Sequence, residues 1–114
     1  MLTNVNLAYL AGLMDGDGCI SMVMHKKNGR QTPYLHVNMG LMNGDIDAAL
    51  KLLKELPGNC SYSETKKGKL FQYQAYGLKG VEAIRLLSPY LIHKAEAADA
   101  VLRFYESDRD EAFR

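Results

Sequence analysis

Two carboxylates, Asp15 and Asp17, end a segment of this 114-residue sequence in which apolar residues recur at helical spacing. The C-terminal end of a helix is the negative end of its macrodipole, so a carboxylate there is disfavoured unless a cation lies nearby. Carboxylate oxygens are good ligands for hard divalent cations. The pattern therefore indicates a metal site at this helix end, although Asp-Gly is by itself a common turn sequence.

The same predicted helix contains two glycines, Gly12 and Gly16, which are four residues apart and so share one face. Glycine inside a helix costs about 0.5–1 kcal/mol relative to alanine. Two such costs indicate that another helix packs closely against this face. Two copies of the helix, packed about a two-fold axis, would bring two Asp17 carboxylates together. We assign Tyr9 and Leu13 to the same contact.

The elements that must position these residues follow from periodicity and turn sequences. We predict a helix over 6–17, strands over 19–27 and 32–42, a helix over 45–56, strands over 59–65 and 70–76, a short helix over 81–87 and a last helix over 91–106. Asn4 or Asn6 is expected to cap the first helix, and Asn28-Gly29 favours a type I′ hairpin turn. The order α-β-β-α-β-β-α-α predicts one α+β domain over 1–114. It has a four-stranded antiparallel sheet with the helices on one face, and a frayed tail over 107–114.

The sheet face without helices is expected to be polar. Strand alternation places on it Ser21, Val23, His25, Lys27, His36, Asn38, Gln72 and Gln74. Small polar groups of this kind can hydrogen-bond base edges in a DNA major groove. A solvated antiparallel sheet face shows the same alternation without any ligand.

Charge is sorted along the chain although its net value is only +1. Segments 19–44 and 59–79 hold seven basic residues and one acidic residue, a net +6, and the remainder holds seven basic and twelve acidic residues, a net −5. This sorting favours a basic face for a polyanion, with Arg30 and Lys66 at the hairpin turns as contacts. Lysines at hairpin tips also simply protect edge strands. Because the register of the second hairpin is open, Tyr62 and Glu64 are further possible contacts.

Several classes of protein are excluded or disfavoured by composition. Cys19 and Cys60 are too few for a disulfide framework and lack metal-site spacing. No stretch approaches the roughly 20 apolar residues that span a membrane, and the start does not resemble a signal peptide. We therefore expect no membrane partner. The expected location is cytoplasmic in a prokaryote or phage, and organellar or nuclear otherwise.

The nine residues from Leu10 to Gly18 have the sequence LAGLMDGDG and directly precede a predicted strand. This segment resembles the motif of the LAGLIDADG homing endonucleases. Seven of the nine positions agree, with Met14 where isoleucine is usual and Gly16 in place of alanine. The chain holds one such motif and no second copy, so it is similar to the single-motif members of that family. The element order extends the resemblance to nearly the whole chain, but only the motif is specific.

The resemblance implies that the four-stranded sheet is saddle-shaped and lies in the DNA major groove. It also implies a homodimer that recognises a long, near-palindromic site in double-stranded DNA. It implies hydrolysis of phosphodiester bonds with Mg²⁺ or Mn²⁺ at the dimer axis. Asp17 is similar to the family's metal-binding residue, and the backbone carbonyl of Gly16 would lie beside it. Asp15 is expected to support the helix junction instead of the metal.

Two further catalytic assignments come from the same resemblance. Lys94 follows a proline-aromatic-leucine run, as does a lysine near the family's active site, and would stabilise charge on the phosphate. Asn43 matches a Gln or Asn at the end of the second strand and would orient a water molecule. The alternatives are a surface lysine and a turn asparagine. Asp47 departs from the pattern, because some members have a basic residue in that helical turn.

Two other interpretations remain open at this point. The first is a DNA- or RNA-binding module that has lost cleavage, such as an intron maturase or regulator, and metal-dependent cutting of the bound DNA would separate it from an endonuclease. The second is a protein unrelated to nucleic acids with a chance motif. That protein would be monomeric, with no metal dependence and no salt-sensitive affinity for DNA.

Overall fold

The computed structural model of this chain describes residues 2–42 and 47–112, and their side chains except those at 25, 27, 30–32, 42, 47–48 and 107–112. The elements are α1 (Asn4–Asp17), β1 (Gly18–Lys27), β2 (Arg30–Met42), α2 (Asp47–Leu53), β3 (Asn59–Thr65), β4 (Gly68–Tyr76), α3 (Gly77–Leu87), the 3-10 turn η1 (Ser88–Tyr90) and α4 (Ala95–Ala112). The predicted element order is confirmed, with η1 added between the last two helices.

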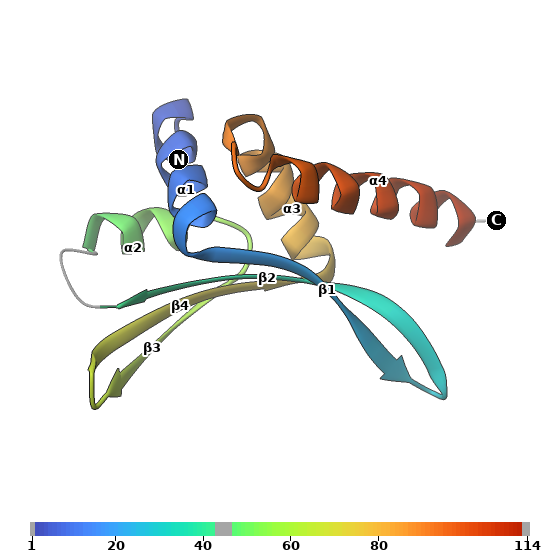
Figure 1. Cartoon of the computed structure of the whole chain (residues 1–114), viewed down its shortest axis with the longest axis horizontal. Helices are drawn as coiled ribbons and strands as arrows, with labels where there is room; N and C mark the ends of the chain where they lie inside the picture. Colours follow the sequence, from blue (N-terminus) through green and yellow to red (C-terminus); the bar gives the residue numbers. More distant parts are fainter. Residues whose placement is uncertain (1, 43–46, 113–114) are drawn as a thin grey trace.

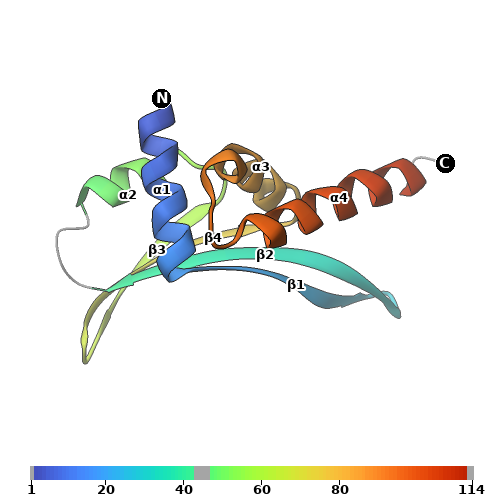
Figure 2. The ribbon, with the colours of Figure 1, turned by 45° about the horizontal axis from the view of Figure 1, so that its top comes forward.

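The four strands form one antiparallel sheet in the order β1-β2-β4-β3. Helices α1 to α4 lie on one face of this sheet, and both hairpins bend away from them (Figure 1). The same arch is visible after rotation in Figure 2. The face without helices is therefore concave, and the predicted α+β class with a saddle-shaped sheet is confirmed.

Both hairpins turn more tightly than the sequence pattern alone indicated. Asn28 and Gly29 have positive φ values of 54° and 78°, the backbone that a type I′ turn requires. Because the turn uses only these two residues, Lys27 pairs directly with Arg30, and β2 begins two residues earlier than predicted. Strand β4 likewise begins at Gly68, before its predicted start at 70.

The residues that flank helix α1 explain its two boundaries. Thr3 is the N-cap, and its Oγ1 accepts a hydrogen bond of 3.1 Å from the backbone N–H of Asn6. The predicted caps, Asn4 and Asn6, are wrong because both lie inside the helix. Gly18 follows the helix in extended backbone, and a Cβ there would clash with Sδ and the carbonyl oxygen of Met14, so glycine is required where the chain leaves α1 for β1.

Helix α2 is shorter than predicted at the end that the structure describes. It ends at Leu53, whereas the apolar pattern continued to Leu56. The N–H of Leu56 donates to the carbonyl of Leu53, three residues back, which is a 3-10 contact. The cause is Pro57, because a proline disfavours helical backbone in the residue before it. The predicted cap at Asp45 lies outside the described residues.

The last two helices also differ from their predicted bounds. Helix α3 begins at Gly77, ahead of the predicted 81, because the positive φ of 56° at this glycine turns the chain straight from β4 into the helix. Helix α4 begins at Ala95 and not at 91, because another part of the fold binds the backbone of 92–94. It continues to Ala112, into the segment predicted to fray.

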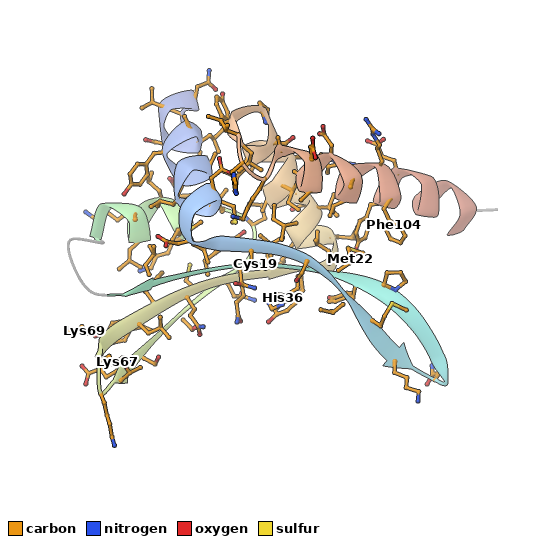
Figure 3. The ribbon with its side chains drawn as sticks, in the orientation of Figure 1. Cys19, Met22, His36, Lys67, Lys69 and Phe104 are labelled. Carbon is orange, nitrogen blue, oxygen red and sulfur yellow. The ribbon has the colours of Figure 1, made fainter. Side chains whose placement is uncertain are left out.

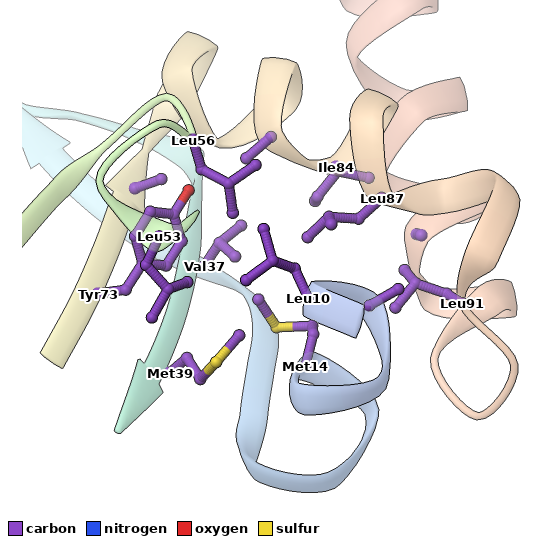
Figure 4. Close-up of a cluster of buried hydrophobic side chains, with 14 of the residues drawn as sticks. Leu10, Met14, Val37, Met39, Leu53, Leu56, Tyr73, Ile84, Leu87 and Leu91 are labelled. Atoms are coloured by element: carbon purple, nitrogen blue, oxygen red, sulfur yellow. The ribbon is translucent and has the colours of Figure 1, made fainter. Parts of the chain in front are cut away.

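One hydrophobic core lies between the helices and the sheet (Figure 4). The largest fully buried side chains are Tyr73, Leu10, Met14, Leu35, Met39, Leu53, Ile84, Leu87 and Val37. Leu35, Val37 and Met39 alternate along β2, so the predicted inward face of this strand is confirmed. The core fixes one side of α1 and leaves the opposite side at the surface. Among the described helices, none is long and apolar enough to cross a membrane.

The buried Tyr73 provides a test of this packing. Its hydroxyl donates a hydrogen bond to the carbonyl of Pro57, and burial raises the pKa of the phenol above its usual range. Tyr73→Phe keeps the ring but leaves that carbonyl without its donor, so we expect a loss of about 1–3 kcal/mol in the free energy of unfolding. Chemical denaturation measures this. Tyr62→Phe, at a side chain 52% exposed, is the control and should change stability by less than about 0.5 kcal/mol. Equal losses in the two variants would contradict the assignment.

Candidate active site and nucleic-acid interface

Asp17 is the last residue of α1, and its side chain is exposed. The helix ends at Asp17 and β1 begins at Gly18, so this end of α1 lies beside the sheet (Figure 1). No basic residue stands in the last turn of the helix. The negative end of the dipole therefore has no counter-charge from its own helix, and a cation bound at Asp17 would be stabilised there.

Asp15 is bound to a segment that is distant in the sequence. Its Oδ2 accepts a hydrogen bond of 2.8 Å from the backbone N–H of Ile92, and its Oδ1 accepts one of 2.9 Å from that of Lys94. The backbone N–H of His93 also contributes. Three successive N–H groups around one carboxylate form an anion-binding concavity. Asp15 thus joins the end of α1 to the start of α4, which is the junction role expected for it.

The protonation state of Asp15 follows from these contacts. Partial burial acts to raise its pKa, but the backbone hydrogen bonds from Ile92, Lys94 and His93 and the positive charge of Lys94 together outweigh burial. The pKa of Asp15 is lowered as a result. The carboxylate is therefore ionised at neutral pH, when its hydrogen bonds to backbone N–H groups are strongest.

Lys94 lies at the same helix end. Its Nζ donates a hydrogen bond of 2.9 Å to the backbone carbonyl of Asp15. Carbonyls in the last turn of a helix lack helical partners, so the ammonium group caps the negative end of α1. This bond takes one of the three donors of the ammonium group, which leaves capacity for an oxygen of a ligand. The structure thus brings Lys94 to the end of the helix that carries Asp17.

The predicted metal ligands, Asp17 and the carbonyl of Gly16, are adjacent and exposed at the end of α1. Within residues 2–42 and 47–112, however, no cluster of three or more His, Cys, Asp or Glu side chains is present that could hold a metal. Asp15 is already engaged by backbone N–H groups. Mg²⁺ is usually bound through one or two carboxylates and keeps several waters, and among the described residues at this helix end Asp17 is the carboxylate that remains exposed.

Part of the predicted site falls beyond the described residues. Asn43, expected to orient water, lies outside them. Asp47 is the first residue of α2, but its side chain is not described. Both assignments remain predictions.

The outward face of α1 is open. A Cβ added at Gly12 or at Gly16 would meet none of the described residues within 4 Å. Packing against these residues therefore does not require either glycine, and none of the described contacts explains why the helix carries the cost of two glycines. Tyr9, 47% exposed, and Val5, 78% exposed, are large apolar side chains at the surface of this helix. Leu13, also assigned to the contact, is half-buried against the core.

Strand register places six of the predicted DNA contacts together on the concave face. Ser21 pairs with His36, and Asn38 pairs with Gln74. By the same alternation, Val23 and Gln72 share this face. His36 points away from the helices in Figure 3. The side chains of His25, Lys27 and Arg30 are not described, and Lys66 lies in the turn between β3 and β4.

Solved structures with this architecture bind DNA. The homing endonuclease I-CvuI, in complex with the I-CreI target in 2 mM Mg and with the DNA not cleaved, matches 90% of this chain at a TM-score of 0.67 and 20% identity. The group I intron-encoded homing endonuclease I-CeuI, complexed with DNA, matches 97% at 0.66 and 13% identity. The meganuclease I-SmaMI, bound to uncleavable DNA, matches 91% at 0.66 and 15% identity.

The chain has the homing-endonuclease fold. It spans 66% of the I-CvuI chain, 60% of the I-CeuI chain and 38% of the I-SmaMI chain. No family model matches the sequence, and no curated protein does. At these sequence identities the likeness is one of fold alone.

This homing-endonuclease fold carries an aromatic group on its concave face that the sequence analysis missed. The ring of Tyr76 stacks on His36 with 4.6 Å between centroids and on Tyr34 with 6.3 Å. Nε2 of His36 is buried and has no hydrogen-bond partner among the described residues. The contacts of the His36 side chain that the structure shows are thus those of an aromatic stack with Tyr76. Extending the Gln72, Gln74 alternation by one step would have found Tyr76.

The register of the second hairpin corrects another expectation. Asn59 and Ser61 pair with Gln74 and Gln72, so these two β3 residues join the concave face. Tyr62 and Glu64 have the opposite alternation and lie on the other face of the sheet. Consistent with this, Nζ of Lys69 lies 5.9 Å from the ring centroid of Tyr62. Neither Tyr62 nor Glu64 is placed to contact a ligand of the concave face.

The lowered pKa of Asp15 predicts how acid affects this homing-endonuclease fold. A carboxyl group whose pKa is depressed by folding adds stability above its unfolded pKa, and this stability is lost as the pH falls through the folded pKa. The stability difference between wild type and Asp15→Asn should therefore be largest at neutral pH and shrink below about pH 4. Denaturant titrations in metal-free buffer measure it. A difference that stays constant from neutral pH to about pH 3 would contradict the assigned cause.

Proposed function

We propose that this protein is a site-specific double-stranded DNA endonuclease of the LAGLIDADG homing-endonuclease family, which acts as a homodimer with divalent metal. The observation behind the proposal is the end of α1. Asp17 is exposed there, the ammonium group of Lys94 binds the backbone two residues earlier, and the glycine face of the same helix is open. The fold supports it, since the compared proteins are homing endonucleases and a meganuclease with bound DNA.

A second copy of the chain would complete the metal site. Two α1 helices in contact at Gly12 and Gly16 would bring two Asp17 carboxylates and two Gly16 carbonyls to one axis. This all-oxygen set fits Mg²⁺ or Mn²⁺, and I-CvuI structures were obtained with 2 mM Mg and with 2 mM Ca. A bound divalent ion supplies Lewis-acid stabilisation of phosphoryl oxygens and lowers the pKa of bound water.

The residues of the chain have separate tasks in this proposal. Asp17 would hold the ion, together with the backbone carbonyl of Gly16. The ammonium group of Lys94, fixed at the same helix end, donates to a phosphate oxygen whose negative charge grows as the bond is cleaved. Asn43 would orient water. Ser21, Asn38, Gln72 and Gln74 present hydrogen-bonding groups to base edges from the concave face.

The shape and charge of the sheet fit a DNA duplex. The sheet is arched, so its concave face could fit around a cylinder of the shape of a duplex (Figure 1). Basic residues stand at both hairpin turns in the sequence, Lys27 and Arg30 at one and Lys66 and Lys67 at the other. Basic residues at the rim would contact phosphates, which position the protein, whereas polar residues at the centre would contact bases. Because a homodimer repeats both sets of contacts about a two-fold axis, its target is a long pseudo-palindrome.

The proposal is tested by isolating a target and cutting it. DNA bound by the purified protein would be selected from a randomised library in Ca²⁺, and the selected sequences incubated with Mg²⁺ or Mn²⁺. We expect cutting of both strands near the centre of a palindromic sequence. Asp17→Asn should slow single-turnover cutting by at least about 100-fold, since it removes a charged metal ligand, while DNA affinity is retained.

The control is Asp99→Asn, which removes an exposed carboxylate from α4 and should leave cutting unchanged. If the protein binds a palindromic sequence tightly but cuts it with none of the metal ions, the endonuclease proposal is wrong. The result would then favour a dimeric DNA-binding module, such as a maturase or regulator. Failure to select any DNA sequence would reject the proposed function.

The homodimer has its own test at Gly12. A Cβ at Gly12 would meet none of the described residues of its own chain within 4 Å. Gly12→Val would however separate the two α1 helices, so we expect the dimer dissociation constant to rise by at least about 10-fold, or 1.4 kcal/mol. Sedimentation equilibrium measures this. Ala97→Val adds a similar apolar group at an exposed position of α4 and should leave association unchanged. A monomeric wild type, or equal effects of both variants, would argue against this contact.

A further inference from the structure

Lys94 is held by Asp15 at two points. The carboxylate of Asp15 accepts the backbone N–H of Lys94 at 2.9 Å, and the backbone carbonyl of Asp15 accepts its Nζ at 2.9 Å. A third bond, from the N–H of Ile92 to the carboxylate at 2.8 Å, fixes the preceding loop. One residue of α1 thus binds both the main chain and the ammonium end of one lysine.

This arrangement addresses a problem specific to lysine. A lysine has a flexible four-carbon stem and loses much rotamer freedom when its ammonium group is fixed. Displacing a reacting group by about 1 Å can cost on the order of 100-fold in rate. With both ends of Lys94 fixed to Asp15, the position of Nζ is set relative to the backbone of α1, two residues before Asp17.

We propose that Asp15 is the positioning residue for Lys94, an inference that rests on the proposed endonuclease function. The Asp15 carboxylate sets the backbone of 92–94, and the Asp15 carbonyl then receives the ammonium group. Asp15 acts on cleavage only through Lys94. It does not join the metal, because its two carboxylate oxygens are already engaged by backbone N–H groups.

A double-mutant cycle tests this dependence. Single-turnover cutting of the selected DNA would be measured for wild type, Asp15→Asn, Lys94→Met and the double variant. Each single variant should be slowed by about 10- to 100-fold with DNA affinity unchanged. The double variant should be no slower than Lys94→Met, because Asp15 has nothing left to position. If the two rate losses multiply in the double variant, Asp15 acts independently of Lys94 and the inference is wrong.

A matched control separates this role from general charge effects. Glu96→Gln removes a carboxylate from the first turn of α4, where Glu96 is exposed. It should change neither cutting nor binding. Asp15→Glu keeps a carboxylate acceptor on a longer side chain and should recover part of the rate that Asp15→Asn loses. A partly recovered cleavage rate in Asp15→Glu would show that the carboxylate acceptor matters. It would also argue against the explanation that Asp15→Asn is slow only because it does not fold.

Amide hydrogen exchange on the metal-free protein gives a readout that does not depend on cleavage. We expect Asp15→Asn to lose protection at Ile92 and Lys94 while the core strands β2 and β4 stay protected. Unchanged protection at 92–94, in a wild type that cuts DNA, would overturn this inference alone. If Asp15→Asn instead loses protection throughout the fold, Asp15 stabilises the whole structure and does not specifically position Lys94, which would also overturn the inference. A wild type that cuts no selected DNA would overturn the proposed function, and the link of Asp15 to cleavage with it.

Discussion

A helix that ends in Asp15-Gly16-Asp17 gathers negative charge where its own dipole is already negative. At Asp15 this negative charge is stabilised by backbone N–H groups that lie 77 and 79 residues further along the sequence. The ammonium group of Lys94 also binds the helix end. The helix end is therefore not a local structure. Its hydrogen bonds are complete only when residues 92–94 lie against α1, so the candidate site depends on contacts between the two ends of the chain.

The core makes the second demand on the same helix. Leu7, Leu10, Ala11 and Met14 bury one side of α1, and the close approach at Gly18 fixes where the chain leaves it for β1. Packing of the buried side chains fixes how closely α1 lies against the core, and the hydrogen bonds of Asp15 fix its C-terminal end. The helix therefore has little freedom to rotate or to slide along its axis. Its outward face is thereby held in a defined position relative to the concave sheet, as contact with a symmetric partner would demand.

Features dictated by adjacent residues were predictable from the sequence. Asn28-Gly29 specifies its turn, and the alternation along β2 specifies which side chains are buried. Features that depend on distant partners were not. The residues after 91 continue a helical pattern, yet Asp15 binds their N–H groups and delays α4 to Ala95. The stack of His36 on Tyr76 needs β2 beside β4, and no local pattern shows that pairing. The metal-binding role proposed for Asp17 followed both from the charge at a helix end and from the family resemblance. The role proposed for Lys94 came from the resemblance alone, because periodicity marks this residue only as a surface charge.

The open face of α1 also limits how such a protein can evolve. In the proposed dimer, a mutation at Gly12 or Gly16 appears twice at the same point of contact, so each new side chain must fit against itself. A mutation on the concave face, at Gln74 for example, likewise changes recognition in both halves of the target at once. Selection acting on this one chain can move the target only along sequences that stay symmetric. Recognition of two unlike half-sites would become accessible only after gene duplication, once each copy can accumulate its own mutations.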